Sequence, residues 1–314
     1  MSRRGRSLSR RRFLRASGGA AAGGIGLRGR GVAADPTTPW RPRFILASAL
    51  YGTFPLAEIL PEVSRTGATM IDLWPRPHGS QRKEVDELGV DTVREMLAAA
   101  GVTLGGIACY KVGAFNLAGE FAIARRLGAE SPVLVTTAPG KGAAPAAELT
   151  AAIGGFLAKL GPSLAAAAET GGVIAIENHS NSLLQTADGI SRFADAVKSE
   201  HLGVALAPHH LPQDAELIAA IARDLGPRLK FVYAQQHGKG SEDKLPKEDE
   251  LLQLPGRGPL DFGPLMRQLA ALQFPGPVEI FMHPVPRGVP ILDSVAAITA
   301  EVVRSREALL ATLA

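Results

Sequence analysis

Short apolar runs alternate with helical patterns along most of the chain, and this alternation constrains the fold more than any other feature. The predicted strands are residues 44–49, 69–74, 103–108, 132–137, 173–177, 202–207, 229–235 and 277–282. The predicted helices are residues 56–66, 90–100, 115–128, 145–170, 186–199, 214–225, 261–273 and 291–312. Strict alternation favours parallel strands joined by crossover helices, and nearly continuous apolar strands indicate burial on both faces. Because doubly wound sheets rarely need eight such units, we predict an α/β fold, a single (β/α)8 TIM barrel.

Length and composition fit one large domain. The chain has 314 residues, of which 46% are hydrophobic and only 5% aromatic, so its core must consist mainly of Ala, Leu, Val and Ile. Barrels of this kind run to about 250 residues as one domain. The single cysteine, Cys109, excludes an intrachain disulfide and any zinc site built from several cysteines.

The first 34 residues have the pattern of an export signal. Ser9–Arg15 (SRRRFLR) resembles the twin-arginine export motif at every position. An Ala- and Gly-rich stretch follows, and Val32–Ala34 supplies small residues for cleavage. The alternative is a disordered basic arm that binds nucleic acid or lipid. We expect a twin-arginine signal peptide at 1–34, a linker at 35–42, the barrel at 43–314, and a periplasmic or otherwise extracytoplasmic location.

The formal net charge of +4 comes from this N-terminal segment. Residues 1–34 carry nine arginines and no acidic residue, so the rest of the chain has a net charge of −5. A mildly acidic body gives no electrostatic support for a nucleic-acid partner. No segment is apolar enough over the length that a stable membrane anchor needs. We therefore expect a small-molecule partner, and the sequence leaves a homodimer open.

Six of the seven histidines follow the ends of predicted strands, whereas His201 stands at the start of one. The six are His78, His179, His209, His210, His237 and His283. All strand C-termini of a parallel barrel open on one face, which carries the active site. His209 and His210 are adjacent, so on an extended chain only one of them would face the barrel axis. The sequence thus predicts a ring of metal-capable side chains at one mouth of the barrel.

Two glutamates on the strands are candidates for proton transfer. Glu177 ends an otherwise apolar strand, where a carboxylate is costly unless it is paired or binds a metal. A salt bridge to a neighbouring Lys or Arg is the structural alternative. Glu279 shares its strand parity with Phe281 and His283. It could serve as a second base only if its side chain turns into the barrel.

Charged side chains follow the last two predicted strands. Lys239, Arg257 and Arg287 lie in the loops there, and such loops often bind phosphate in barrel enzymes. Solvated surface charge is the equal alternative. Residues 238–259 are long and charged for a loop in a compact domain, so we expect a mobile, protease-sensitive segment over the mouth.

From about residue 43 to 313 the chain resembles the xylose isomerase-like TIM barrels, the sugar phosphate isomerase/epimerase superfamily. Members hold a divalent metal with a Glu ending strand 5, an Asp ending strand 6, a His ending strand 7 and a Glu ending strand 8. Gly256–Phe262 resembles the family's turn before helix 7. Glu177 falls on the strand-5 Glu, and His210 on the His three residues after the Asp. The Asp falls on Ala207, the strand-7 His on Gln235–His237, and the last Glu on Phe281, two residues before His283.

The resemblance implies a divalent metal and proton transfer beside a carbonyl. We expect Zn, Mn, Fe or Co bound by Glu177, His210, His283 and one of Gln236 or His237, because imidazole-rich sites suit these metals better than Mg or Ca. Glu177 and Glu279 are the expected catalytic residues. The expected substrate-binding residues are His179, His209, Lys239, Arg257 and Arg287.

The first hypothesis is therefore an exported, metal-dependent isomerase or epimerase acting on a sugar or related polyol. Because two of the family's carboxylates are missing, the alternative is a non-catalytic carbohydrate-binding barrel. A third is an endonuclease-IV-like phosphodiesterase, since DNA-repair endonucleases share this fold. The net charge of −5 beyond residue 34 argues against a DNA partner.

Overall fold

The computed structural model describes residues 39–238 and 243–314. The chain divides into two units, Met1–Pro39 and Trp40–Ala314, and the second is the folded body. The expected signal peptide and Lys239 lie outside the described residues.

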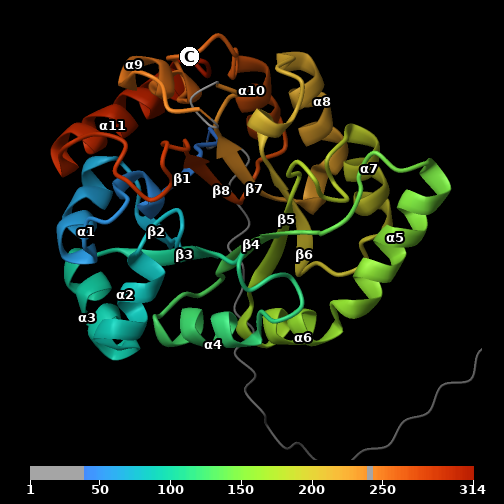
Figure 1. Ribbon diagram of the computed structural model, residues 1–314, viewed down its shortest axis with the longest axis horizontal. Helices are drawn as coiled ribbons and strands as arrows, with labels where there is room; N and C mark the ends of the chain where they lie inside the picture. The colour runs from blue at the N-terminus through green and yellow to red at the C-terminus, as the bar shows by residue number, and fades with distance from the viewer. Residues whose placement is uncertain (1–38, 239–242) are drawn as a thin grey trace, which may run out of the picture. The chain divides into compact units, whose positions relative to one another are not determined.

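Eight parallel strands close into a barrel in which each strand pairs with its neighbours in chain order (Figure 1). The strands are β1 Arg43–Leu46, β2 Met70–Leu73, β3 Thr103–Ala108, β4 Val133–Thr137, β5 Val173–Glu177, β6 Leu202–Leu206, β7 Leu229–Ala234 and β8 Pro277–Ile280. Pairing of β1 with β8 closes the ring, with Ile45 opposite Glu279. The predicted (β/α)8 TIM barrel is confirmed. The strands end within three residues of their predicted bounds because apolar runs buried on both faces mark them clearly.

Helices surround the barrel as an outer ring (Figure 1). They are α1 Leu56–Arg65, α2 Gln81–Leu88, α3 Val90–Ala100, α4 Ala118–Arg126, α5 Ala146–Lys159, α6 Gly161–Thr170, α7 Ala187–Ala196, α8 Ala215–Leu225, α10 Gly263–Ala271 and α11 Val295–Ala311. Two features differ from the prediction. Helix α2 was not expected, and the helix predicted over 145–170 is broken between Lys159 and Gly161. Pro162 explains the break, because its ring would clash with the carbonyl four residues earlier in a continuous helix.

Much of the segment expected to be a mobile loop is folded against the barrel. It contains the short helix α9 (Lys247–Glu250) and a 3-10 turn at Leu251–Gln253. Leu254 and Gln253 are fully buried, and the Gln253 carbonyl accepts the backbone N–H of Gln236 at 2.9 Å. The expectation of a loop that is mobile throughout is therefore wrong for residues 247–254. Leu251 and Leu254, together with Glu250 and Gln253, give this segment a buried face.

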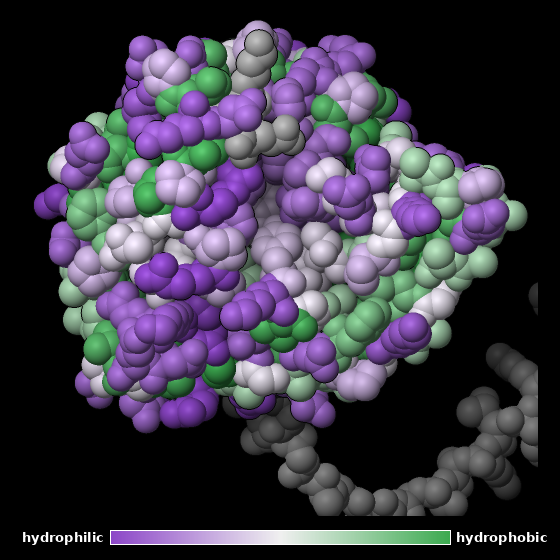
Figure 2. Space-filling model, in the orientation of Figure 1, coloured by the Kyte–Doolittle hydropathy of each residue, from purple (hydrophilic) through white to green (hydrophobic). Residues whose placement is uncertain are grey.

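The mouth at the C-terminal ends of the strands is hollowed, and hydrophilic side chains border the hollow (Figure 2). Within the described part of the chain, no single helix has both the length and the apolar character to cross a membrane. Helices α5 and α6 meet those criteria only when taken together, and they are bent by 55°.

Candidate metal centre at the barrel mouth

A cavity of about 420 Å³ lies at the mouth. Its walls come from the segments that follow β2, β3, β5, β6 and β8, and they include Trp74, Tyr110, Glu177, His209 and His283. A larger hollow of about 770 Å³ lies at the opposite end, around strand starts such as Arg43 and Lys230. Because barrel enzymes place their chemistry at the C-terminal ends of the strands, the smaller cavity is the candidate site.

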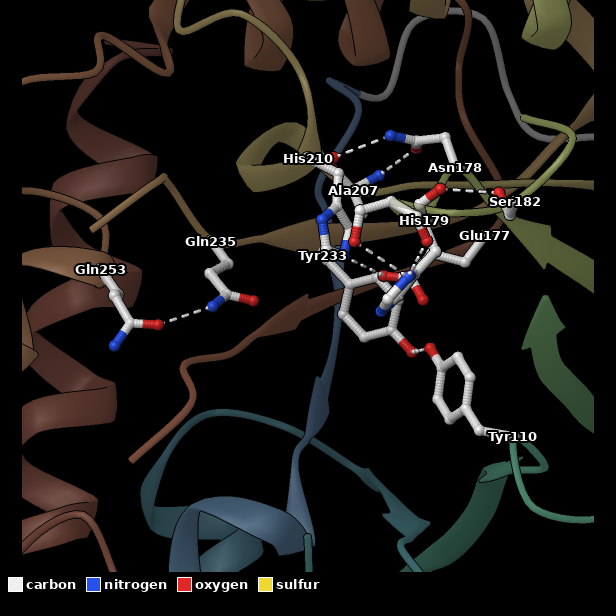
Figure 3. Close-up of polar contacts among 11 residues, drawn as sticks. Tyr110, Glu177, Asn178, His179, Ser182, Ala207, His210, Tyr233, Gln235 and Gln253 are labelled. Atoms are coloured by element: carbon white, nitrogen blue, oxygen red, sulfur yellow. Dashed lines mark hydrogen bonds and ion pairs between the residues drawn. The ribbon is translucent and has the colours of Figure 1, made fainter. Parts of the chain in front are cut away.

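Glu177, His179 and His210 converge beside this cavity (Figure 3). One potential ligand atom of each lies within 4.8 Å of the others. The distance from His210 Nε2 to Glu177 Oε1 is 3.7 Å, too long for a hydrogen bond, and His210 Nε2 has no other hydrogen-bond partner. Two ligands of one tetrahedral zinc ion lie about 3.3 Å apart. The spacing therefore fits two groups that share an ion better than two groups that bind each other directly.

The loops that carry these three residues are joined by Asn178. Its Oδ1 accepts the backbone N–H of Ala207 at 2.7 Å, and its Nδ2 donates to the Ala207 carbonyl at 3.0 Å. The resemblance placed the family's strand-6 Asp at Ala207, and here the backbone of that residue is held by Asn178. These two hydrogen bonds hold the end of β5 against the turn Pro208–His210, which fixes Glu177 relative to His210.

His179 is oriented for coordination through its other ring nitrogen. Its Nδ1 lies 2.6 Å from the Ser180 carbonyl. A carbonyl oxygen can only accept, so Nδ1 carries the proton and Nε2 keeps its lone pair. This is the common arrangement of a metal-binding histidine. The sequence had indicated His179 for substrate binding, and the structure brings it into the metal group instead.

Burial sets the charge state of the group. It lowers the pKa of His210 to about 3, so this imidazole is neutral at pH 7. Burial also raises the pKa of Glu177, whereas His179 and the nearby Tyr110 hydroxyl lower it. A neutral imidazole and a carboxylate together form a donor set suited to a divalent transition metal.

His209 also faces the mouth, contrary to the expectation that His209 and His210 point in opposite directions. The two ring centroids are 3.9 Å apart. The expectation assumed an extended chain, but Pro208–His210 forms a 3-10 turn, in which successive side chains do not alternate. His283 lies on the same cavity, with its ring centroid 5.9 Å from that of His209, and it is not part of the Glu177 group.

Aromatic residues that the sequence interpretation did not single out complete the cavity. The Trp74 ring stacks with Phe281 at 4.8 Å and with Tyr110 at 5.5 Å. The hydroxyls of Tyr110 and Tyr233 lie 3.0 Å apart (Figure 3). The sequence could have indicated Trp74 and Tyr110, because both follow strand ends just as the histidines do.

Glu279 is inside the barrel but does not line the cavity. It precedes Phe281 by two residues and lies one layer below it, facing Asp72 of β2. Burial and then the Asp72 charge raise its pKa well above the ordinary value, so it stays protonated. The expectation of a second catalytic base at Glu279 therefore loses its support. Asp72, which interrupts the apolar run of β2, was the missed partner.

Three further residues have other positions than expected. Gln236 is buried, and its amide bonds the Leu254 carbonyl and the Leu260 N–H at 2.9 and 2.8 Å, so it holds the loop rather than a metal. His237 is exposed and outside the cavity lining. Arg257 forms a two-pronged ion pair with Glu301 of α11 at 2.8 and 2.6 Å, away from the cavity. Arg287 does line the cavity.

The fold and the site define a parallel eight-stranded barrel with a candidate metal centre at the C-terminal ends of its strands. The sequence model of the xylose isomerase-like TIM barrels matches residues 60–301, and the chain belongs to this family. No curated protein matches the chain.

Several solved structures share the fold. A zinc-containing structure of the IolI protein has a TM-score of 0.65 at 14% identity, covering 86% of this chain and 98% of that chain. D-psicose 3-epimerase with D-tagatose, from Clostridium cellulolyticum H10, has a TM-score of 0.60 at 14% identity, covering 86% and 99%. A xylose isomerase domain protein from Alicyclobacillus acidocaldarius subsp. acidocaldarius has a TM-score of 0.59 at 17% identity, covering 86% and 98%. At these identities the likeness concerns the fold alone.

Proposed function

We propose that the protein is a metal-dependent isomerase of a sugar or related polyol, exported by the twin-arginine route. The observation that carries the proposal is the convergence of Glu177, His179 and His210 on one point beside the mouth cavity. Relatives of this fold include a barrel solved with zinc and an epimerase solved with D-tagatose, which supports a metal and a carbohydrate ligand.

The donor set fits zinc, manganese, iron or cobalt. A divalent ion held by Glu177, His179 and His210 would polarise a carbonyl or hydroxyl group of the substrate. Asn178 and the Ser180 carbonyl orient the ligands. The Tyr110 and Tyr233 hydroxyls, whose pKa values burial raises well above the ordinary value, remain protonated. One donates to the other, so the pair has one proton left for Glu177 or a substrate oxygen.

The cavity favours a proton shift by one base over epimerisation by two. Among the described residues that line it, Glu177 is the only carboxylate. Epimerisation by opposed bases needs a second group on the other face of the substrate carbon, and Glu279 is sealed below Phe281. Glu177 can take a proton from one carbon and return it to the next, because its carboxylate lines the cavity beside His210 and the Tyr110 hydroxyl.

The second candidate function is carbohydrate binding without catalysis. In its favour, Glu177 is the only carboxylate among the described residues that line the cavity. The resemblance to the family places Ala207 and Phe281 where its members carry two metal-binding carboxylates. Turnover separates the two functions. The protein, loaded with zinc, manganese or cobalt, is incubated in D2O with a panel of ketoses and aldoses, and carbon-bound deuterium is measured by NMR.

Incorporation of deuterium that is lost in Glu177→Gln supports the isomerase. Binding with neither deuterium incorporation nor formation of an isomer at any metal supports the binding protein. His201→Gln is the matched control, because His201 lies at the other end of the barrel and bonds the Gly172 carbonyl at 2.8 Å.

A further inference from the structure

A second histidine group lines the mouth cavity beside the candidate metal centre. It consists of His78 after β2, His209 after β6 and His283 after β8. The ring centroids of His78 and His283 are 5.0 Å apart, and those of His209 and His283 are 5.9 Å apart. These three residues come from different elements, so the barrel topology alone brings them together.

Three ring nitrogens of this group, two on His209 and one on His283, are buried without a hydrogen-bond partner. His209 is only 8% exposed, and neither Nδ1 nor Nε2 has a hydrogen bond. Nδ1 of His283 is also buried without one. Leaving a buried polar atom unsatisfied costs about 1–3 kcal/mol. Imidazoles that line a cavity and lack partners therefore indicate a ligand that supplies the missing hydrogen bonds.

The imidazoles of His78 and His283 are uncharged. Burial, followed by the repulsion of Arg287 and His179, lowers the pKa of His78 to about 4. Burial, followed by the repulsion of Arg287, holds the pKa of His283 well below the ordinary value. A neutral imidazole offers one donor and one acceptor. A hydroxyl group has the same combination, so adjacent hydroxyls can satisfy adjacent imidazoles.

A second metal ion fits this group less well. Within the described part of the chain, Glu177, His179 and His210 are the residues whose ligand atoms come within 4.8 Å of one another. The second histidine group does not meet that condition, and it offers no carboxylate to balance a cation. Phe281 stands perpendicular to the His283 ring, at 89° and 4.8 Å, and gives the group an apolar side that suits the C–H face of a carbon chain.

We propose that His78, His209 and His283 form a subsite for a vicinal diol, the neighbouring hydroxyls of the polyol part of the ligand that lies away from the metal. The two hydroxyls of the diol hydrogen-bond His209 and His283. The His78 ring packs against the His283 ring and holds it in place. The inference rests on the proposed function for the identity of the ligand as a polyol, but the subsite binds a diol whether or not the protein turns it over.

The test compares two four-carbon probes on the zinc-loaded protein. Erythritol carries adjacent hydroxyls, whereas 1,4-butanediol has the same chain length without them. We expect erythritol at millimolar concentrations to shift the ring signals of His209 and His283 saturably in NMR, and 1,4-butanediol to leave them unchanged. His209→Gln and His283→Gln each weaken erythritol binding about tenfold, the loss of one hydrogen bond, and His201→Gln leaves it unchanged.

Three results would overturn the subsite. They are no saturable shift with erythritol up to about 100 mM, equal shifts with both probes, or variants that lower the bound zinc instead of the affinity for erythritol. The last result would assign these histidines to metal. Failure of the proposed function is distinct, because it appears as missing zinc or missing deuterium exchange in the wild type while erythritol binding persists.

Discussion

Asp72 of β2 and Glu279 of β8 face each other inside the barrel, one layer below the mouth cavity. Asp72 is 4% exposed and Glu279 is fully buried. The Ser48 N–H donates to Asp72 at 2.7 Å, whereas neither oxygen of Glu279 has a partner in hydrogen-bonding geometry. Asp72 is therefore the member that ionises first, and Glu279 keeps its proton. The Trp74 indole, which lines the cavity, lies beside the pair.

This pair makes stability depend on pH. Burial raises the pKa of Asp72 to about 7 and that of Glu279 well above its ordinary value. The folded state then binds more protons than the unfolded state, so the free energy of unfolding falls as pH rises from about 4 through 7 and beyond. Glu279→Gln removes one of the two acids, and we expect it to stabilise the protein by roughly 1–3 kcal/mol at pH 8.5 relative to pH 5.5.

Urea unfolding of wild type and Glu279→Gln across this range measures the effect. The buried histidines, whose pKa values lie below the ordinary one, are common to both proteins and cancel in the difference. Parallel pH profiles for the two proteins would contradict the pairing.

The group of Glu177, His179 and His210 predicts which variants lose bound metal. The double variant Glu177→Ala, His210→Ala should lose bound metal, because it removes two of three converging ligands, while the barrel stays folded. His283→Gln should retain it, since His283 lies outside the group. Elemental analysis after remetallation measures both. Less than a tenth of an equivalent of bound metal in the wild type would exclude the metal centre. Metal loss in His283→Gln would show that His283 is a ligand, as the sequence predicted.

Asn178 should control metal affinity without touching the metal. Asn178→Ala removes both bonds to the Ala207 backbone, so Glu177 and His210 lose their fixed separation. Loss of such an orienting residue typically weakens a metal site 10–100-fold. Competition with a zinc chelator gives the affinity, and the circular dichroism spectrum checks the fold. Unchanged affinity in a folded variant would mean that the two loops are held by other contacts.

Arg257 should matter for stability and not for binding. Arg257→Ala breaks the ion pair with Glu301, and we expect a loss of about 0.5–1 kcal/mol, because Arg257 is 39% exposed and the pair is partly screened. Arg223→Ala, which breaks an exposed pair with Asp224, is the control and should have a smaller effect. A reduced affinity for a sugar in Arg257→Ala would show that Arg257 binds substrate, as the sequence predicted.

Export remains a prediction from the sequence. Changing Arg10 and Arg11 to Lys should leave the precursor in the cytoplasm, because the twin-arginine pair is the signal that the transport machinery reads. Cell fractionation with an antibody locates the protein. Wild-type protein cleaved near Ala34 and found outside the cytoplasm is the expected reference. A double variant that is still exported would favour another route.

The sequence by itself determined the barrel. Eight apolar runs, each buried on both faces, leave a closed parallel sheet as the solution, and polar residues after those runs must gather at one mouth. Glu177 and the histidines at the cavity could therefore be named without coordinates. Helix α2 and the buried face of residues 247–254 could not, because charged residues dominate both segments and hide the few apolar contacts.

Only the tertiary structure decided which of these residues act together. Residue type and strand position favoured His283 and Gln236 as ligands. In the structure His179 joins Glu177 and His210 instead. The turn at Pro208–His210 and the hydrogen bonds of Asn178 set these distances, which spacing along the chain does not encode. The same holds for Asp72 and Glu279, which are 207 positions apart in the sequence. Barrel closure, which pairs β8 with β1 beside β2, turns two isolated acids into one buried pair.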